Sequence, residues 1–263
     1  MDMTNLRASR AALPAIVLFF AAGRADATLS FTNGDFSSFS NATTGLPSQL
    51  GNSGTGGYTS LTGWNVGTGS TGLLAFLIAS GTADTTGSHD VRFNDTFNLW
   101  GTNDGGLNAI PASSPNGGNY VALDADSTYS GTGISQKLGG LVVGQKYAVT
   151  FYWAAAQQLG FDGATTESIQ VGFGTNTPQS TATYNLASHA FSGWMSQTFV
   201  FTAKTTTDTL SFLAVGGPNG LPPFSLLDGV TVTAVPEPAA FALVGLGLLS
   251  IPWIRKLCKR RLP

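Results

Sequence analysis

Apolar and polar residues alternate along several short stretches of this chain, and this period of two is the feature that most limits its fold. In KYAVTFYWA, residues 146–154, one face carries four aromatic or apolar side chains: Tyr147, Val149, Phe151 and Trp153. The same alternation recurs within 169–173, 197–201 and 210–214. Because successive side chains of a β-strand point to opposite faces, this period predicts strands with one face buried.

Turn-forming residues separate these stretches and complete the prediction of fold class. They gather at 143–145, 160–163, 205–208 and 216–223, and the 263-residue chain contains 34 glycines without a collagen-like period. Only 10% of the residues are charged, so the chain is too apolar for a disordered protein. Many short strands without intervening helices predict an all-β domain, a β-sandwich or jelly roll over residues 28–233.

Charge is distributed unevenly along the chain, and the distribution limits its partners. The formal net charge is −2, but most basic residues stand before residue 28 or after residue 254. Between Thr28 and Pro238, four Lys or Arg stand against 12 Asp or Glu, a net charge of −8. Nucleic-acid binding needs clustered basic side chains, so we expect no nucleic-acid partner. The only cysteine is Cys258, which leaves this acidic part without a disulfide or a cysteine zinc site.

The first 27 residues have the pattern of a signal peptide. Arg7 and Arg10 precede an apolar run at 11–22, and Ala25-Asp26-Ala27 supplies small residues where signal peptidase reads them. A run of 12 residues is too short to span a membrane comfortably as a helix. We therefore expect export of the protein, with signal peptidase cutting after Ala27.

The last 30 residues carry a second targeting pattern. Residues 239–254 include no charge, and five basic residues follow within seven positions: Arg255, Lys256, Lys259, Arg260 and Arg261. As a helix rising about 1.5 Å per residue, the uncharged run would extend roughly 24 Å, close to the thickness of a bilayer core. The positive-inside rule keeps the basic cluster in the cytoplasm as a stop-transfer signal. The sequence thus predicts a single C-terminal transmembrane helix.

Val235-Pro236-Glu237-Pro238 stands just before this run, and the order of motif, helix and basic end resembles the PEP-CTERM sorting signal of Gram-negative bacteria that make exopolysaccharide. The resemblance covers residues 234–263. It implies that an exosortase, a membrane transpeptidase, recognises and processes the tail, and that the protein reaches the cell surface or extracellular matrix. The two prolines keep the motif extended, since proline disfavours helix in the residue before it.

A series of short motifs runs through the middle of the chain: NGDFS at 33–37, then GW, NYVALDAD, GISQKL, GQKYAVTFYWA, SGWMSQTFVFTA, DTLSFLA and LLDGVTV. This series resembles the galactose-binding-like jelly rolls, which are related to carbohydrate-binding modules. The resemblance implies a structural calcium where the first and last strands meet, with Asp35 and Asp228 as ligands. The glutamate that usually follows the phenylalanine is Ser37 here, which removes one strong ligand. Without calcium, the two aspartates would cap turns.

Residues suited to catalysis are scarce. The chain has only two histidines and two glutamates: His89, His189, Glu167 and Glu237. We expect both histidines to be exposed. Glycosidases usually pair two carboxylic acids across the sugar bond, and neighbours in a surface turn, such as Asp124 and Asp126, seldom do so. No Gly-x-Ser-x-Gly elbow occurs, and the GxGxxG at 67–72 follows no clear strand, so we expect a protein that is not an enzyme.

Sugar binding needs aromatic faces with hydrogen-bonding side chains beside them, and the chain has both. The aromatic candidates are Trp64, Trp100, Tyr129, Tyr152 and Trp153. Trp100 stands in a polar segment, FNLWGTNDGG, that is typical of an inserted loop, whereas Trp153 shares a strand face with Phe151 and is expected in the core. We predict a ligand site made of four residues: Trp100, Asn103, Asp104 and Tyr152.

Two functions from different classes are consistent with these patterns. The first is an exported, non-enzymatic surface or matrix protein that is trimmed through its tail and binds extracellular polysaccharide. The second is a secreted carbohydrate-active enzyme, similar to a glycoside hydrolase, on the same sandwich. The scarcity of glutamate and histidine favours the first. A purely structural matrix protein without a specific ligand would have the same sequence features as the first.

Overall fold

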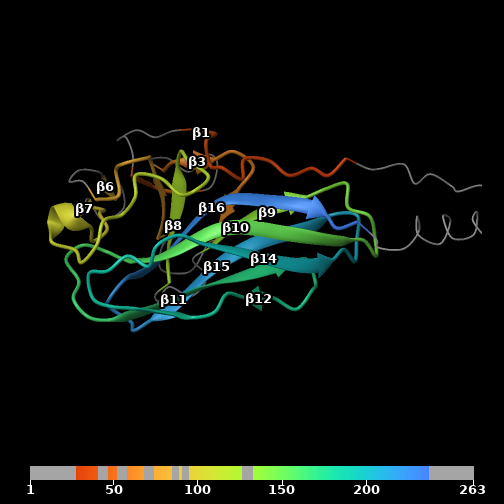
Figure 1. Ribbon diagram of the computed structural model, residues 1–263. Helices are drawn as coiled ribbons and strands as arrows, with labels where there is room; N and C mark the ends of the chain where they lie inside the picture. The colour runs from red at the N-terminus through yellow and green to blue at the C-terminus, as the bar shows by residue number, and fades with distance from the viewer. Residues whose placement is uncertain are drawn as a thin grey trace, which may run out of the picture.

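The computed structural model describes residues 28–40, 47–51, 58–67, 74–84, 89–90, 95–125 and 133–236 (Figure 1). Within these segments the regular structure consists of β-strands and one short 3-10 helix, η1, at Thr102–Asp104. The paired strands of both large sheets run antiparallel. The prediction of an all-β domain is confirmed.

Two six-stranded sheets make up most of the domain. The strand order in the first sheet is β14 (Met195–Thr202), β10 (Lys146–Gln157), β16 (Pro223–Ala234), β8 (Tyr120–Asp124), β5 (Ala75–Ile78) and β2 (Ser48–Gln49). The order in the second sheet is β12 (Gln179–Ser180), β11 (Thr165–Phe173), β15 (Asp208–Gly217), β9 (Gly133–Leu138) and β4 (Asn65–Val66), and β13 (Tyr184–Leu186) also pairs with β11. Two ribbons add β1 (Phe39–Ser40) with β3 (Ser60–Leu61), and β6 (His89–Asp90) with β7 (Asp95–Thr96).

The two sheets pack face to face. The side chains between them are the apolar ones that the alternation predicted to be buried. From β8 to β11, and again from β14 to β16, successive strands lie in opposite sheets, as the strands of a jelly roll do (Figure 1). The inward side chains of β10, including Phe151 and Trp153, share one buried cluster with Ile169 and Val171 of β11. The expected core position of Trp153 is confirmed, since it is 3% exposed.

The first sheet is buried on its other face as well. There Phe76, Ala122 and Phe224 from three neighbouring strands pack under loop residues that include Phe97 and Phe191. As a result, β5 and β8 are buried at every position. A strand covered on both faces shows no period of two, which explains why alternation did not mark these strands in the sequence.

The two chain ends of the described domain lie at the same end of the sandwich. Ser30 bridges to Gly139 just after β9, and the Val235 N–H donates to the carbonyl of Lys146 at the start of β10. The helix η1 lies at the opposite end (Figure 1). We call these two ends the tail end and the η1 end.

Most of the predicted targeting segments lie outside the described residues. These are the signal peptide (1–27), Glu237 and Pro238, the helix at 239–254 and the basic cluster at 255–261. Val235 and Pro236 are described, and Pro236 is exposed. None of the helical structure in the described segments has the length and apolar character needed to cross a membrane.

Candidate functional site

Trp100 is fixed at the η1 end by contacts from two other loops. It directly follows Leu99, which forms a β-bridge with Gln158, and it lies just before η1. The indole Nε1–H of Trp100 donates to the carbonyl of Phe161 at 2.9 Å. Its ring stacks on the imidazole of His189, with ring centroids 3.8 Å apart and planes 25° apart. Trp100 is half-buried, so part of the indole is available to solvent.

His189 is held by both its backbone and its ring. Its N–H donates to Gln157 Oε1 at 3.1 Å, and its carbonyl accepts from the Leu107 N–H at 2.9 Å. Its Nε2 lies 2.5 Å from Asp162 Oδ1. Its φ of 63° lies in the left-handed region, which a non-glycine residue keeps only where surrounding contacts hold it. His189 is therefore part of a fixed cluster, which corrects the expectation of a freely exposed polar side chain.

Gln157 connects the three loops that supply these side chains. It is the last residue of β10 and is fully buried. Its Nε2 donates to the Gly163 carbonyl at 3.1 Å, and its own carbonyl accepts from the Trp100 N–H at 3.0 Å. Together with the bond from His189, these contacts hold the indole, the imidazole and Asp162 in position before any ligand binds. We call Trp100, His189 and Asp162 the Trp100 cluster.

The Trp100 cluster places an aromatic pair beside a solvent-facing carboxylate. The Asp162 side chain is 82% exposed and the His189 side chain is 27% exposed. A sugar is recognised by apolar contact of its ring with an aromatic side chain and by hydrogen bonds from its hydroxyls to a few fixed polar groups. The cluster supplies both kinds of group at one exposed end of the molecule.

Asn103 and Asp104 support the loop that follows Trp100. The Asn103 N–H donates to Asp84 Oδ2 at 3.1 Å, and its Nδ2 donates to the Asp84 carbonyl at 2.9 Å. Burial is the main factor that raises the pKa of Asp84; the bond from Asn103 opposes the rise, and the charge of Asp104 adds to it. Asn103 and Asp104 thus lie close to Trp100 in the chain, but the side chain that they contact is Asp84.

Tyr152 is not brought to the Trp100 cluster. It pairs in register with Ser196 and Asp228 of the neighbouring strands, with its ring beside Gly229. Trp100 meets β10 at Gln157, five residues further along the strand, or about 17 Å at the usual rise per residue. The predicted four-residue site is therefore divided over three places.

Asp35 and Asp228, the predicted calcium ligands, do lie near each other. Asp228 is fully buried next to Ser114, whose hydroxyl donates to its carboxylate. Burial raises the pKa of Asp228 to about 6; the bond from Ser114 opposes the rise, and the negative charge of Asp35 adds to it. Asp35 Oδ1 accepts from the Ser37 hydroxyl at 3.0 Å. The described residues contain no group of three or more His, Cys, Asp or Glu side chains that could hold a metal, so backbone or water oxygens would have to complete a calcium shell.

Burial places the aromatic candidate Trp64 in the core and corrects the expectation for Asp124. Trp64 is 4% exposed, and its Nε1–H donates to the Asn33 carbonyl at 2.9 Å, so it is a core residue. Asp124 is 2% exposed at the end of β8 and does not lie in a surface turn.

Sequence reasoning missed Asp162 and dismissed His189. The two residues are 27 positions apart in different loops, and neither belongs to a spaced motif. One local signal was available: Asp162 lies in the glycine-flanked turn at 160–163 that was identified as a turn. The pairing itself arises only when β10, β11 and β13 bring their loops to the same end.

Comparisons with known proteins give structural likenesses only. No family model matches the chain. No curated protein sequence matches it either. Among solved structures, the search finds TmCBM61 in complex with β-1,4-galactotriose, at 13% identity over 66% of this chain and 90% of that chain, with a TM-score of 0.35.

Two other carbohydrate-binding modules are found at similar levels. A CBM4 structure is 19% identical over 54% of this chain and 88% of its own, with a TM-score of 0.30. The CBM22-1 xylan-binding domain of Xyn10C from Paenibacillus barcinonensis is 10% identical over 61% of this chain and 86% of its own, also with a TM-score of 0.30. The sandwich described above follows from the strand pairing of this chain, and not from likenesses at this level.

Proposed function

We propose that this chain is an exported, non-enzymatic surface or matrix protein of a Gram-negative bacterium, and that its β-sandwich binds extracellular polysaccharide through the Trp100 cluster. The observation that carries this proposal is the fixed Trp100–His189 stack beside the exposed Asp162 carboxylate. A site that is ordered before binding loses little conformational entropy when its ligand arrives. Its aromatic surface and fixed polar groups are those that a sugar needs.

The position of the cluster supports the proposed role. Trp100 stands two residues before η1, which lies at the end of the sandwich opposite residues 28 and 236 (Figure 1). A domain held at the membrane by its C-terminal tail would therefore present the cluster away from its attachment. This arrangement suits a protein that reaches from the cell surface into a surrounding polysaccharide.

The proposed delivery uses signal peptidase, the membrane and an exosortase as partners. Where the chain leaves the sandwich, the Gln145 side chain donates to the Val235 carbonyl at 2.5 Å, and the next residue, Pro236, is exposed. The start of the Pro-Glu-Pro motif is thus accessible to a processing enzyme. This accessibility supports exosortase processing at the tail.

The test is equilibrium binding of the protein to a panel of immobilised and soluble polysaccharides. Trp100→Ala should weaken binding at least about tenfold, or roughly 1.4 kcal/mol. Asp162→Asn should weaken it severalfold without changing the melting temperature, because that side chain is 82% exposed. Tyr152→Ala is the matched aromatic control and should bind as the wild type does. Loss of binding in Tyr152→Ala alone would contradict the assignment to the Trp100 cluster.

The enzymatic alternative and the structural alternative are decided by the same experiment. Asp84 lies against Gly101, next to Trp100 in the chain, and interacts with Asp104; a glycosidase would need such a carboxylate pair. Release of reducing sugar that Asp84→Asn abolishes would establish the enzyme. Failure of every polysaccharide to bind would establish a matrix protein without a specific ligand.

We also propose a structural calcium ion, held by Asp35, Asp228 and backbone carbonyls. The support is the approach of the two carboxylates where the 33–36 turn meets β16, with the Val230 N–H donating to the Gly34 carbonyl at 2.9 Å. An ion that binds only the folded state raises its stability. In thermal unfolding, the melting temperature should therefore be higher with added calcium than with a chelator. Asp228→Asn should remove this difference.

A further inference from the structure

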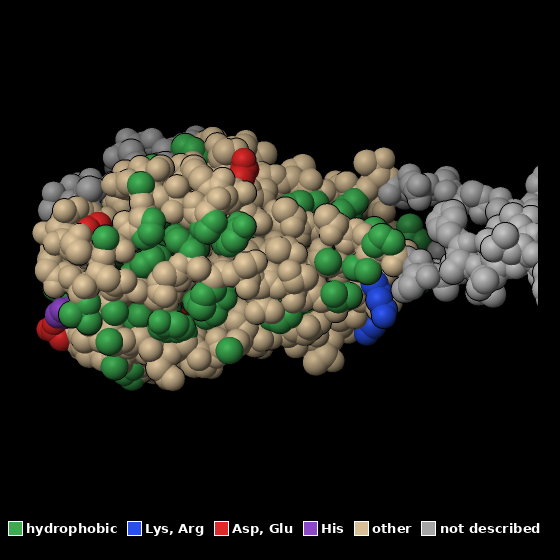
Figure 2. Space-filling model, in the orientation of Figure 1, with side chains coloured by type: hydrophobic (Ala, Val, Ile, Leu, Met, Phe, Trp, Pro, Cys, Tyr) green, Lys and Arg blue, Asp and Glu red, His purple; other side chains and the backbone are tan. Residues whose placement is uncertain are grey.

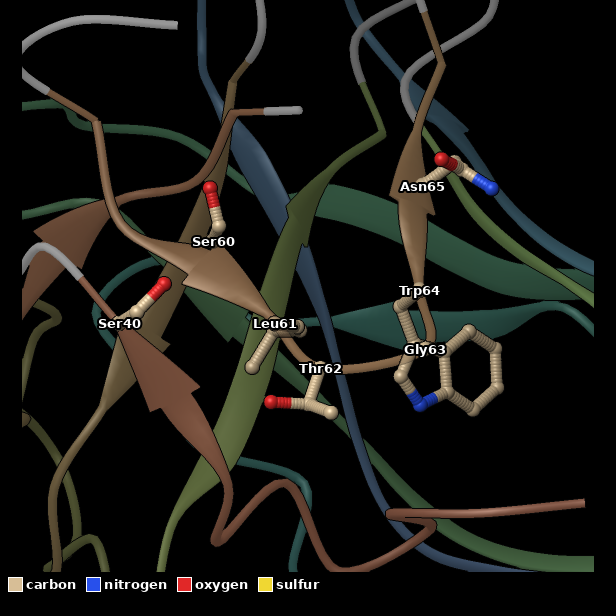
Figure 3. Close-up of a pocket in the computed structure, with 7 residues that line it drawn as sticks. All are labelled: Ser40, Ser60, Leu61, Thr62, Gly63, Trp64 and Asn65. Carbon is tan, nitrogen blue, oxygen red and sulfur yellow. The ribbon is translucent and has the colours of Figure 1, made fainter. Parts of the chain in front are cut away.

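A polar groove lies where β3 turns into β4 (Figure 3), and none of its described lining residues belongs to the Trp100 cluster. Its volume is about 390 Å³, within the range of small-molecule sites. Among the described residues, seven line the groove: Ser40, Ser60, Leu61, Thr62, Gly63, Trp64 and Asn65. Ser40 and Ser60 are direct cross-strand partners of β1 and β3, so their side chains are neighbours.

Ser60 has a hydroxyl without a hydrogen-bond partner. The residue is 5% exposed, and Ser60 Oγ is buried with no donor or acceptor in reach. A buried polar group without a partner costs about 1–3 kcal/mol, so native proteins rarely keep one that has no use. Because Ser60 lines the groove, a molecule seated against it would supply the partner that this hydroxyl lacks.

The other lining groups are neutral and limit the chemistry of that molecule. None of the seven side chains is charged. Thr62 Oγ1 accepts from the Ser38 hydroxyl at 2.8 Å and keeps its own hydrogen to donate, and Asn65 is exposed with both amide donors and acceptor. Trp64 is 4% exposed and its Nε1–H is bonded to the Asn33 carbonyl, so its side chain offers a ligand neither a hydrogen bond nor an open ring face. Neutral hydroxyl and amide groups suit a neutral polyhydroxylated ligand, and the described lining residues supply no cation for a phosphate or carboxylate.

We propose that this groove is a second saccharide site, specific for neutral sugar units and independent of the Trp100 cluster. The ligand class rests on the proposed function, but the site does not share a residue with it. Two separate sites on one domain would let the protein hold two segments of a polysaccharide, which raises its effective affinity without further contacts.

The experiment is isothermal titration of the full chain with neutral β-1,4-linked oligosaccharides of xylose, glucose and galactose. Ser60→Ala is the main variant, because removing an unpartnered hydroxyl should leave the melting temperature unchanged or slightly raised. Asn65→Ala is the second variant, since Asn65 is exposed on β4. Ser196→Ala, an exposed serine of β14, is the matched control.

We expect the wild type to bind two equivalents, and both Ser60→Ala and Asn65→Ala to weaken one of them about three- to tenfold. Trp100→Ala should leave the binding of sugar at the groove unchanged. A single equivalent that is lost only in Trp100→Ala would overturn the groove site and leave the proposed function standing. Binding lost in Ser60→Ala but intact in Trp100→Ala would support the groove and overturn the Trp100 cluster. Absence of binding to any of the sugars would mean that the groove holds water only.

Discussion

At the scale of single residues, the buried polar side chains Gln157 and Glu167 differ in how fully they are hydrogen-bonded. Gln157 has both ends of its amide bonded and joins three loops. Glu167 of β11 differs, because only the Thr165 hydroxyl donates to it, at 2.5 Å, and its Oε2 has no partner. Burial raises the pKa of Glu167 to about 8, and the bond from Thr165 opposes the rise. In the folded protein, the Glu167 carboxyl group therefore keeps its proton up to about pH 8.

Glu167 should make the protein less stable as the pH rises. Its pKa is about 8 in the folded state and about 4.3 in an unfolded chain, so the folded state binds the proton more tightly. The free energy of unfolding should therefore fall between about pH 4.5 and pH 8, by at most ~1.4 kcal/mol per pH unit. Urea unfolding at pH 5, 6.5 and 8 measures this slope.

Glu167→Gln supplies the control for this prediction. The amide keeps the shape of the side chain but does not titrate, so most of the slope between pH 6 and 8 should disappear. Asp228, with a pKa of about 6, contributes a slope of the same sign below this window. An unchanged slope in Glu167→Gln would show that another group is responsible.

At the scale of elements, the pair β10 and β16 forms the centre of the first sheet. Each strand has 12 residues, and their register shifts between Thr150 and Tyr152. There the single residue Phe151 of β10 stands opposite Gly229 and Val230 of β16, which is a β-bulge. Gly229 supplies the extra residue, with a φ of 59° that favours glycine. Asp228 stands next to the bulge and contacts Ser114, whereas Leu227 and Val230 on either side belong to the cluster between the sheets.

Gly229→Ala should destabilise the protein by about 1–3 kcal/mol. The backbone there is left-handed, and an added Cβ would lie 2.9 Å from Tyr152 Cδ2 and 3.0 Å from Asn116 Cβ. Gly139→Ala is the control, because its Cβ would meet only Ser30 Cβ at 3.6 Å. Thermal unfolding compares the two variants. Equal melting temperatures would mean that the bulge tolerates a side chain.

At the scale of the whole molecule, the two ends of the sandwich differ in composition. The lysines in the described part of the chain lie at the tail end: Lys137 at the end of β9, Lys146 at the start of β10 and Lys204 just after β14. Figure 2 shows basic side chains gathered there and few charges over the rest of the visible face. The η1 end carries Asp84, Asp104 and Asp162 with the aromatic stack. The domain thus has a basic tail end and an acidic, aromatic η1 end.

The mature protein should lack both terminal segments. Processing by signal peptidase and an exosortase would leave a chain that begins at Thr28 and ends within a few residues of Pro236, where the last strand is complete. Intact-mass measurement of the protein isolated from the producing cell checks this expectation. Recovery of the full 263-residue chain from the cytoplasm would contradict it.

The sequence by itself determined the fold class, because the period of two in β10, β11, β14 and β15 records which face of each strand is buried. The alternation is a local signal, because it can be read within each strand separately. It could not reveal β5 or β8, whose two faces are both buried. Only the tertiary structure decided which side chains share a site. The stack of Trp100 on His189 and the pair of His189 with Asp162 join loops that are distant in the chain. Such contacts depend on how the strands are ordered in the sheets, and no short stretch of sequence encodes that order.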